Sequence, residues 1–357
     1  MSEARADDDP DPESGEAAAP PDPAGKPVYV SADGARISRT GELIEIVLPD
    51  GARHGARLGE VSELVLNGNI ALTTPCLHEL LRRGIPVSWC TGQGWFLGHA
   101  AAADHGNVAL RIAQHRAAED PAAVLGIARA VIVAKIANSR TLLRRNRKLR
   151  NPLNAALSGL EEAQRRALAA RDLAALNGIE GAAAALYFPA FGELLTPPGD
   201  EAALHLAHRT RRPPADPVNA LLSYAYGLLV RNCILALTPI GFDVGRGFLH
   251  QPRPGRPALA LDLMEPLRAT LADAAVLRLV NTGAVSGADF ETGPEGVRLS
   301  AAGRRALIAA YERRLDEGVR HPEGGRMSYR RLIGFEARQL AGFLVGRRAL
   351  PDFFVRR

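Results

Sequence analysis

The sequence predicts an α+β, multidomain protein, with a small N-terminal β-sheet or sandwich domain followed by a larger all-α-helical C-terminal domain. The chain has 357 residues, which exceeds the usual size of one compact domain. Short β-branched runs separated by Asp-Gly, Thr-Gly and Asn-Gly pairs fill residues 28–103. From residue 104 to 357 the chain is rich in Ala, Leu and Arg, and apolar residues recur with a helical period.

The charge is distributed unevenly along the chain. Residues 1–27 contain eight acidic and two basic residues and no large apolar side chain beyond Met1. Such a segment cannot bury enough surface to offset its ordering entropy, so we expect a disordered acidic tail over 1–27. The remainder has 42 Lys and Arg against 31 Asp and Glu, a net charge of +11. This charge is compatible with a polyanionic partner but does not require one.

The N-terminal domain, residues 28–103, is expected to hold about six strands and one helix. Strands are predicted on both sides of the Asp-Gly and Thr-Gly turns within residues 28–58, and another ends at the Asn-Gly pair near residue 68. The helix is expected over 71–84, because Arg82, Arg83 and Gly84 are typical of a helix C-terminus. Two further strands are expected around Gly92 and Gly94.

The C-terminal domain is predicted to be a helical bundle. Pro121 and the pair Asp216–Pro217 are favourable helix entries. An almost wholly apolar run over 218–237 predicts a buried central helix. Six cations between Arg140 and Arg150 indicate either a solvated helix face or a surface that contacts phosphates. The expected helices cover 109–119, 121–148, 151–176, 218–237, 270–282, 299–318 and 328–346.

Several classes of protein are disfavoured by the sequence. The three cysteines, Cys76, Cys90 and Cys233, form no CxxC pair, so we expect reduced, buried thiols. No run of eighteen apolar residues predicts a membrane span, and the acidic N-terminus is not a signal peptide. A cytoplasmic location without membrane attachment is therefore expected. P-loop, GxSxG and HExxH motifs do not occur in the sequence.

The stretch 241–268 carries the most chemically distinctive residues. Asp262 and Glu265 are three positions apart, so they share one face of a helix, in an otherwise apolar segment. Burying both acids requires a cation, a metal ion or a cluster of N–H groups, unless they only stabilise a helix N-terminus. His250 lies twelve positions earlier; a lone histidine is more often structural than a ligand. One histidine with carboxylates forms a mixed donor set that suits Mn²⁺ or Mg²⁺.

Glu180 is a third candidate acid. It lies between Gly178 and Gly181 and precedes the apolar run 182–188, so it is expected to point into tightly packed surroundings. By itself this signal is weak, because glutamates are common at helix starts.

Three blocks together resemble the CRISPR-associated adaptation integrase family, whose members insert new spacers into CRISPR arrays in antiviral defence. The blocks are IEGAAAALYF (179–188), RRPPADPVNALLSYAYGLL (211–229) and GFDVGRGFLHQPRPGRPALALDLMEPLR (241–268). The resemblance covers residues 28–350. It implies an N-terminal β-domain used for dimerisation and a helical domain that holds one divalent metal, Mg²⁺ or Mn²⁺.

The resemblance also implies roles for individual residues. Glu180, His250 and Glu265 match the metal ligands of the family, and Asp262 matches a second acid that supports catalysis close to the metal. The implied partners are double-stranded DNA (protospacer and CRISPR repeat) and the small second CRISPR adaptation protein, which bridges two homodimers in one integration complex. The implied reaction is attack of a DNA 3′-hydroxyl on a phosphodiester of the repeat.

Arginines close to these residues in sequence are candidates for holding the DNA backbone, because phosphate contacts need cations rather than a base-reading helix. Two alternatives remain open from the residues alone: a stand-alone structure-selective nuclease for branched DNA, and a non-enzymatic basic helical scaffold that binds DNA. The DNA-binding candidates are Arg211, Arg212, Arg246, Arg253, Arg256 and Arg268.

Overall fold

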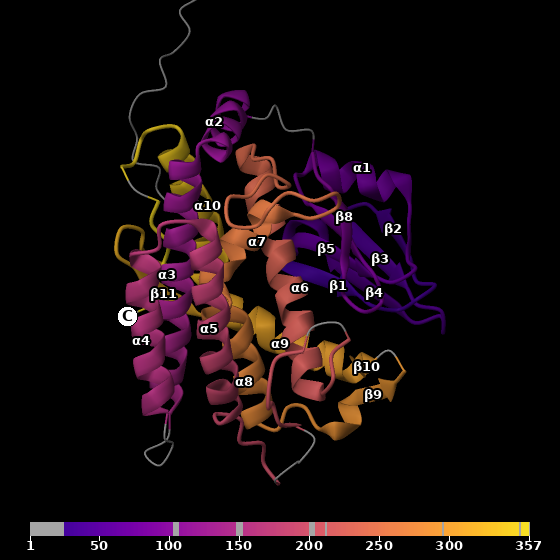
Figure 1. Ribbon diagram of the computed structural model, residues 1–357. Helices are drawn as coiled ribbons and strands as arrows, with labels where there is room; N and C mark the ends of the chain where they lie inside the picture. The colour runs from indigo at the N-terminus through magenta and orange to yellow at the C-terminus, as the bar shows by residue number, and fades with distance from the viewer. Residues whose placement is uncertain are drawn as a thin grey trace, which may run out of the picture.

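The fold has a β-rich part over residues 26–100 and a helical part over residues 108–344 (Figure 1). The computed structural model describes residues 25–102, 107–147, 153–199, 204–210, 213–294, 296–349 and 351–356. The predicted disorder of residues 1–24 therefore lies outside the described residues. The predicted tail boundary is wrong for Lys26 and Pro27, which belong to a strand and pair with Val61 and Glu63. The α+β class predicted from the sequence is confirmed.

The β-rich part contains two four-stranded sheets. The first has the order β1-β5-β7-β8, with β1 (Lys26–Val30), β5 (Val61–Asn67) and β7 (Val87–Cys90) parallel and β8 (Phe96–Ala100) antiparallel to β7. The second has the order β4-β3-β2-β6, and pairs β2 (Arg36–Thr40), β3 (Leu43–Val47) and β4 (Arg53–Arg57) antiparallel. Its last strand, β6 (Ala71–Leu72), runs parallel to β2.

Both sheets share one apolar core with helix α1 (Thr74–Arg82). Ile37 and Ile44 of the second sheet, Leu64 of the first and Leu80 of α1 are all fully buried in this core. The predicted helix and turns are confirmed; for example, Gly41 follows β2 with a φ of 59°. Residues 25–102 hold eight strands rather than about six, because the run 28–47 folds into three strands and the two-residue β6 was too short to predict.

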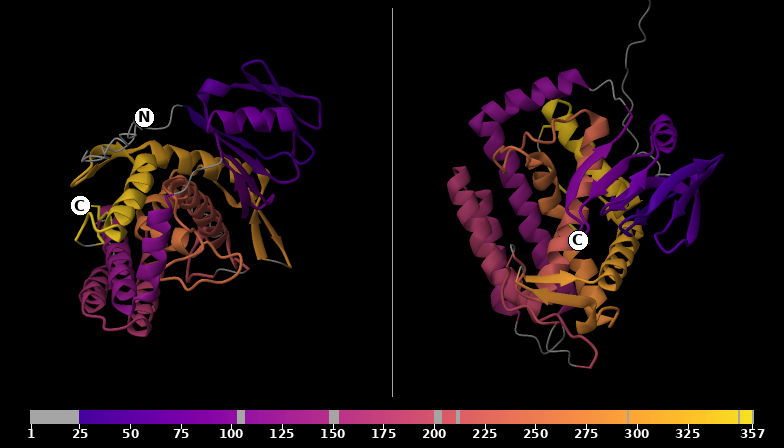
Figure 2. Two further views of the ribbon diagram at one scale, coloured as in Figure 1. Left: turned by 90° about the horizontal axis from the view of Figure 1, so that it is seen from above. Right: turned by 90° about the vertical axis from the view of Figure 1, so that its right-hand side faces the viewer.

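Most helices of the helical part agree closely with the predicted ranges, but the helices over Leu173–Gly192 and Ala258–Met264 were not predicted. Three helices, α3, α4 and α5, pack against one another on the side of the molecule away from the sheets (Figure 2). Helix α6 runs between this layer and the β-rich part (Figure 1). The helices are α2 (Val108–Glu119), α3 (Pro121–Asn146), α4 (Asn154–Leu168), α5 (Leu173–Gly192), α6 (Pro217–Leu237), α7 (Ala258–Met264), α8 (Ala274–Asn281), α9 (Ala301–Asp316) and α10 (Tyr329–Leu344).

Two details of the predicted helical domain are wrong. It is not entirely helical, because two antiparallel hairpins interrupt it: β9 (Phe290–Gly293) with β10 (Gly296–Leu299), and β11 (Gly318–His321) with β12 (Gly325–Ser328). Strands of four residues give too little alternation to be recognised beside long helices. The segment predicted as one helix over 151–176 also breaks before Asp172, whose side chain caps α5 by accepting from the Ala175 N–H at 2.8 Å.

Helix α3 and the segment Pro217–Ile240 are long and apolar enough to cross a membrane by length and composition. Both pack against other helices of the helical part, and each carries a charged side chain with partners inside the protein. Lys135 lies in α3, and Arg231 lies in α6. Buried helices of a globular core have the same apolar composition, so we interpret both as core helices. The three cysteines are free and buried, as predicted.

A buried ionic cluster joins the two parts. Arg231 of α6 is only 1% exposed and lies 3.3 Å from Glu63 of β5 through its Nε. Its Nη2 donates to the hydroxyl of Tyr29 in β1 at 2.6 Å, and that hydroxyl donates to Glu312 of α9 at 2.5 Å. Ser88 of β7 also donates to Glu63 at 2.8 Å. Charges from both parts thus compensate one another at their shared boundary.

Replacing Arg231 by methionine is expected to lower the free energy of unfolding by about 3–5 kcal/mol, because Glu63 would remain buried without its cation. Urea unfolding of the full chain measures this change. The matched control is Arg140→Met, whose exposed pair with Glu161 is worth about 0–1 kcal/mol. A loss below about 1 kcal/mol for Arg231→Met would contradict the assigned role of the cluster.

Candidate active site

The loop that leads into the site is clamped by helix α2. Gly241 ends α6 and its short extension with a φ of 97°, and a Cβ there would lie 2.6 Å from the Asn107 nitrogen. The fully buried side chain of Gln114 donates to the carbonyls of Asp243 and Arg246 at 2.8 and 2.7 Å. It also accepts from the Asp243 N–H at 2.9 Å. The start of the loop is therefore fixed before it reaches His250.

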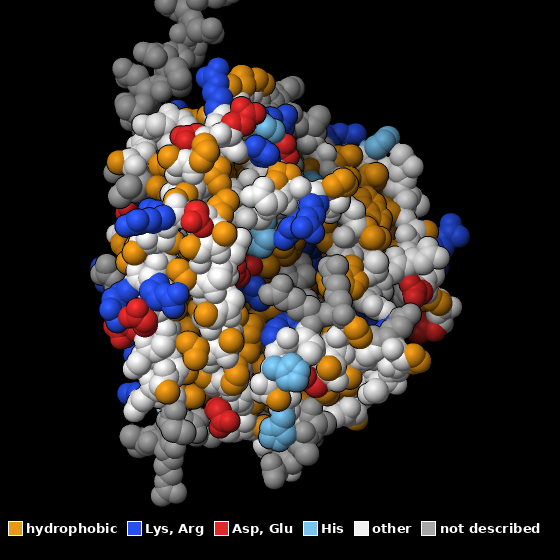
Figure 3. All heavy atoms as spheres, viewed as in Figure 1, with side chains coloured by type: hydrophobic (Ala, Val, Ile, Leu, Met, Phe, Trp, Pro, Cys, Tyr) orange, Lys and Arg blue, Asp and Glu red, His pale blue; other side chains and the backbone are white. Residues whose placement is uncertain are grey.

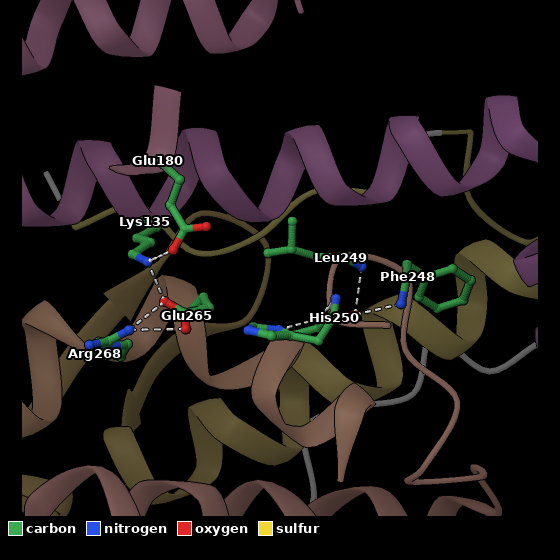
Figure 4. A network of polar contacts seen from close by, with 8 residues as sticks. Lys135, Glu180, Phe248, Leu249, His250, Glu265 and Arg268 are labelled. Atoms are coloured by element: carbon green, nitrogen blue, oxygen red, sulfur yellow. Dashed lines mark hydrogen bonds and ion pairs between the residues drawn. The ribbon is translucent and has the colours of Figure 1, made fainter. Parts of the chain in front are cut away.

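Asp262 of α7 fixes the end of the same loop. Its carboxylate, 2% exposed, accepts from the N–H groups of Phe248, Leu249 and His250 at 2.6, 3.0 and 2.9 Å. A second contact joins Asp262 Oδ1 to His250 Nδ1 at 2.7 Å (Figure 4). Only glycine fits at position 247, because a Cβ would lie 2.9 Å from Asp262 Oδ2. Asp262 therefore acts as a positioning residue that orients the imidazole of His250.

The alternative interpretation of Asp262 and Glu265 as helix N-terminal acids is wrong. Helix α7 begins at Ala258, so Asp262 lies in its second half and Glu265 is its C-cap residue. The helical backbone continues past Glu265 through a 3-10 turn over Glu265–Leu267, so neither acid lies in the first turn of α7, where the helix dipole would stabilise it. Glu180 is likewise not a helix-start residue, because α5 begins at Leu173. These acids are held in place by their partners rather than by helix ends.

Glu180 and Glu265 converge on one ammonium group. Lys135 of α3 lies with its Nζ 2.5 Å from Glu180 Oε1 and 2.6 Å from Glu265 Oε2 (Figure 4). Arg268 donates through Nη1 to both oxygens of Glu265 at 3.0 Å. The sequence brings these groups together because Glu265 and Arg268 are three positions apart and α3 crosses the turn that contains them.

The cations keep Glu265 ionised despite its burial. Burial raises the pKa of this carboxyl, but the charges of Arg268 and Lys135 lower it by a larger amount. The net effect is a pKa well below the ordinary value of 4.5. The guanidinium of Arg268 also stacks on the ring of Tyr226, 4.1 Å from its centroid. Tyr226 and Tyr187 both donate to buried Asp273, at 2.6 and 2.7 Å.

His250, Glu265 and Arg268 line one cleft of about 1000 Å³ between helix α6, the 241–257 loop and strand β8. The imidazole of His250 extends toward Glu265 (Figure 4). Its Nδ1 contacts Asp262, and its Nε2 lies on the side of Glu265. Cationic and histidine side chains gather around the hollow between the helical and β-rich parts (Figure 3).

The predicted DNA-binding arginines differ in their placement. Arg253 and Arg256 line the cleft, and their phosphate-holding role stays a prediction. Arg246 instead donates to the carbonyl of Ala118 at 2.9 Å, which ties the loop to α2. Arg268 is buried beside Glu265. Arg211 and Arg212 lie outside the described residues, as do Lys148 and Arg150 of the predicted cationic run.

Lys135 and Asp273 are site residues that the sequence reasoning missed. Lys135 interrupts the apolar run VIVAKIA (131–137), just as Asp262 interrupts its own apolar segment. The rule that a buried charge needs a partner applies equally to a lone lysine, so this signal was available. Asp273 is the last residue of a π-helical segment, Ala269–Asp273, and this segment directs its side chain in a way that α-helical spacing alone does not predict.

The donor chemistry fits a divalent cation. Two carboxylates already share one ammonium group, and a histidine held by a third carboxylate lines the same cleft as Glu265. Within the described ranges no three acidic, histidine or cysteine side chains converge on a single point, because Lys135 stands between the glutamates. Glu180, His250 and Glu265 therefore stay a prediction as metal ligands. Acidic ligands at the end of an arginine-lined cleft are typical of proteins that act on phosphate esters.

Comparison with known proteins identifies the family. Residues 28–313 match the family model for "CRISPR associated protein Cas1". The chain is 37% identical over 327 residues to the CRISPR-associated endonuclease Cas1 3 of Thermus thermophilus, covering 89% of this chain and 94% of that protein. The chain therefore belongs to the Cas1 family of CRISPR-associated proteins.

Other relatives are longer than this chain. It is 44% identical over 344 residues to a CRISPR-associated exonuclease Cas4/endonuclease Cas1 fusion of Geobacter sulfurreducens, covering 94% of this chain and 62% of the fusion. A similar fusion from Rhodospirillum rubrum is 46% identical, and the chain spans 57% of its length.

Solved structures share the fold. A Cas1 protein from Thermotoga maritima superposes with a TM-score of 0.77 at 24% identity, covering 93% of this chain and all of that one. A casposase bound to integration product gives a TM-score of 0.80, also at 24% identity, and covers 92% of this chain and 93% of that one. A chain of a Cas6-RT-Cas1–Cas2 complex gives 0.77 at 26% identity and covers 94% of this chain and 36% of that one.

Asp262→Ala is expected to lower the free energy of unfolding by at least about 3 kcal/mol, because three N–H groups of the His250 loop would lose their acceptor. Urea unfolding measures the change. The control is Asp243→Ala in the same loop. Its half-exposed carboxylate accepts one backbone N–H, from Gly245, and has an exposed contact with His115 at 3.2 Å, so its loss should cost about 1 kcal/mol. Equal losses in the two variants would contradict the role of Asp262.

The stability contributed by Glu265 is expected to depend on pH in one direction. Its folded-state pKa is lowered, so its ion pairs stabilise the protein fully above about pH 4.5, and this contribution is lost as the pH falls through the folded pKa. In metal-free buffer the wild type should therefore have a higher free energy of unfolding than Glu265→Gln above about pH 4.5, and this difference should decrease as the pH is lowered further. Unfolding experiments from neutral to acid pH test this; a pH-independent difference would contradict it.

Proposed function

We propose that this protein is a metal-dependent DNA endonuclease and integrase that inserts new spacers into a CRISPR array. The observation that carries this proposal is the convergence of Glu180 and Glu265 on one cation, at the end of a cleft lined by His250, Arg253 and Arg256. Membership of the Cas1 family, whose relatives are named endonucleases, supports the nuclease assignment.

The proposed reaction is the attack of a DNA 3′-hydroxyl on a phosphodiester of the repeat. The O–P bond that forms joins the incoming strand to the repeat, and the O–P bond that breaks releases a 3′-hydroxyl of the repeat strand. A divalent ion, Mg²⁺ or Mn²⁺, held by Glu180, His250 and Glu265 would supply positive charge against the attacked phosphate.

The residues of the chain have separate tasks in this scheme. Asp262 keeps the imidazole of His250 in one orientation through Nδ1. Arg268 neutralises Glu265 and keeps it ionised inside the protein. Arg253 and Arg256 hold the sugar–phosphate backbone in the cleft by charge, so DNA binding should weaken steeply with salt.

The proposed partners are protospacer and repeat DNA, the small second CRISPR adaptation protein and a second copy of this chain. We place two homodimers in one integration complex, with the β-rich part as the dimerisation surface, and the complex in the cytoplasm. A related protein with 26% identity has been solved in a complex with Cas2, which supports the second adaptation protein as a partner.

Alanine at Glu180, His250 or Glu265 is expected to reduce integration below about one hundredth of the wild-type rate while the protein still folds and dimerises. The assay is integration into a supercoiled repeat-bearing plasmid, with and without the second adaptation protein. Glu161→Ala, an exposed acid of α4, is the control and should keep wild-type activity.

Full integration by His250→Ala with added Mn²⁺ or Mg²⁺ would remove this residue from the ligand set. Cleavage of branched DNA without integration would favour a stand-alone structure-selective nuclease. DNA binding that ignores chelator, together with unchanged function in Glu265→Ala, would favour a non-enzymatic scaffold.

A further inference from the structure

The chain uses lysine very sparingly. It has 44 Lys and Arg together, and only three of them are lysines, at positions 26, 135 and 148. One of these three is the residue whose ammonium joins Glu180 to Glu265. In a protein that uses arginine for nearly every other cation, a lysine at this point indicates a requirement that arginine does not meet.

The two cations at the site differ in the way they bind. Arg268 contacts both oxygens of Glu265 through Nη1 and stacks on Tyr226, so its position is fixed from several sides. Lys135 presents a compact charge on a flexible stem and contacts one oxygen of each glutamate. Its side chain is 15% exposed. The site therefore combines a fixed cation with one that can be released.

Space for a released ammonium exists beside it. A cavity of about 30 Å³ is lined by Lys135, Ser139, Glu180, Tyr187 and Asp273. Ser139 lies one helical turn beyond Lys135 on the same face of α3. A volume of this size accommodates roughly one water-sized group. The ammonium can thus leave the gap between the glutamates and remain beside polar atoms.

We propose that Lys135 is a resident cation that holds Glu180 and Glu265 together until a divalent ion arrives, and that it is displaced from between them when the ion binds. The inference rests on the proposed metal-dependent function. The carboxylates of buried Glu265 and half-buried Glu180 would repel each other without the ammonium between them, so the lysine stabilises the metal-free protein. The same positive charge opposes a divalent ion, so the lysine also weakens metal binding.

Lys135→Met tests both consequences. In metal-free buffer the variant should have a lower Tm than the wild type, and Mn²⁺ should raise its Tm by more than it raises that of the wild type. Calorimetric titration of the full chain should give a Kd for Mn²⁺ at least about tenfold lower than that of the wild type. Lys135→Gln, which is polar but uncharged, should behave similarly if the methionine variant does not fold.

Arg140→Met is the matched control. It removes a cation from the same helix, but one paired with Glu161 at the surface, and its Kd for Mn²⁺ should stay within about twofold of the wild-type value. Equal or weaker Mn²⁺ binding by Lys135→Met would overturn the proposal, because the lysine would then only organise the carboxylates.

A second measurement needs no substitution. With only three lysines, selective ¹³C labelling at lysine Cε gives a simple NMR spectrum in which each signal can be assigned. Saturation with Mg²⁺ should shift the Lys135 signal and leave the signal of exposed Lys26 unchanged. A Lys135 signal that does not move at saturating Mg²⁺ would overturn the displacement.

The result also separates this inference from the proposed function. If the wild type binds Mn²⁺, Glu265→Ala does not, and Lys135→Met binds as the wild type does, the metal site stands and the role of Lys135 fails. If neither the wild type nor any variant binds Mn²⁺ or Mg²⁺, both the metal site and the displacement fail.

Discussion

The charge of Glu265 must be compensated inside the protein, and the geometry of the site depends on this constraint. The residue is only 3% exposed, and an isolated buried carboxylate costs several kcal/mol. Compensation comes from two directions: Arg268 lies one turn further along the chain, and Lys135 reaches in from α3. The guanidinium of Arg268 is buried as well, and it stacks on the ring of Tyr226. The hydroxyl of Tyr226 in turn donates to Asp273.

Helix α3 places the compensating charge accurately because it is anchored at the same turn. Asn138, three residues after Lys135, is fully buried and donates to the carbonyls of Pro266 and Phe354 at 2.7 and 2.8 Å. One helix face therefore binds the carboxylate of Glu265, the backbone of the next residue and the C-terminal segment. A site built on packed helices keeps its spacing better than one built on loops. His250 is the site residue that lies on a loop, and Gln114 and Asp262 hold this loop at its two ends.

The sequence predicted the larger features because long helices and repeated turn signals have clear periods. It also selected Asp262 and Glu265, since charges in an apolar run need partners. Glu180 and His250 were weak signals by themselves, and the family resemblance added them to the set. It did not predict which partner each would take. The placement of Lys135 depends on how α3 crosses the 265–267 turn, and no local pattern in α3 encodes that crossing. The β9–β10 and β11–β12 hairpins were missed for another reason: strands this short are stabilised mainly by contacts outside their own sequence.

Asp262 in α7 and Glu265 at its C-cap have different roles because they have different hydrogen-bonding and ion-pair partners. Asp262 and Glu265 are three residues apart and both buried, yet Asp262 is held by backbone N–H groups and Glu265 by side-chain cations. Backbone donors are fixed by the fold, and an arriving cation cannot replace them without unfolding the loop. A lysine ammonium competes directly with such a cation for the same oxygen atoms. The difference makes Asp262 suited to permanent positioning of His250, and it makes Glu265, together with Glu180, the pair of carboxylates able to exchange one cation for another.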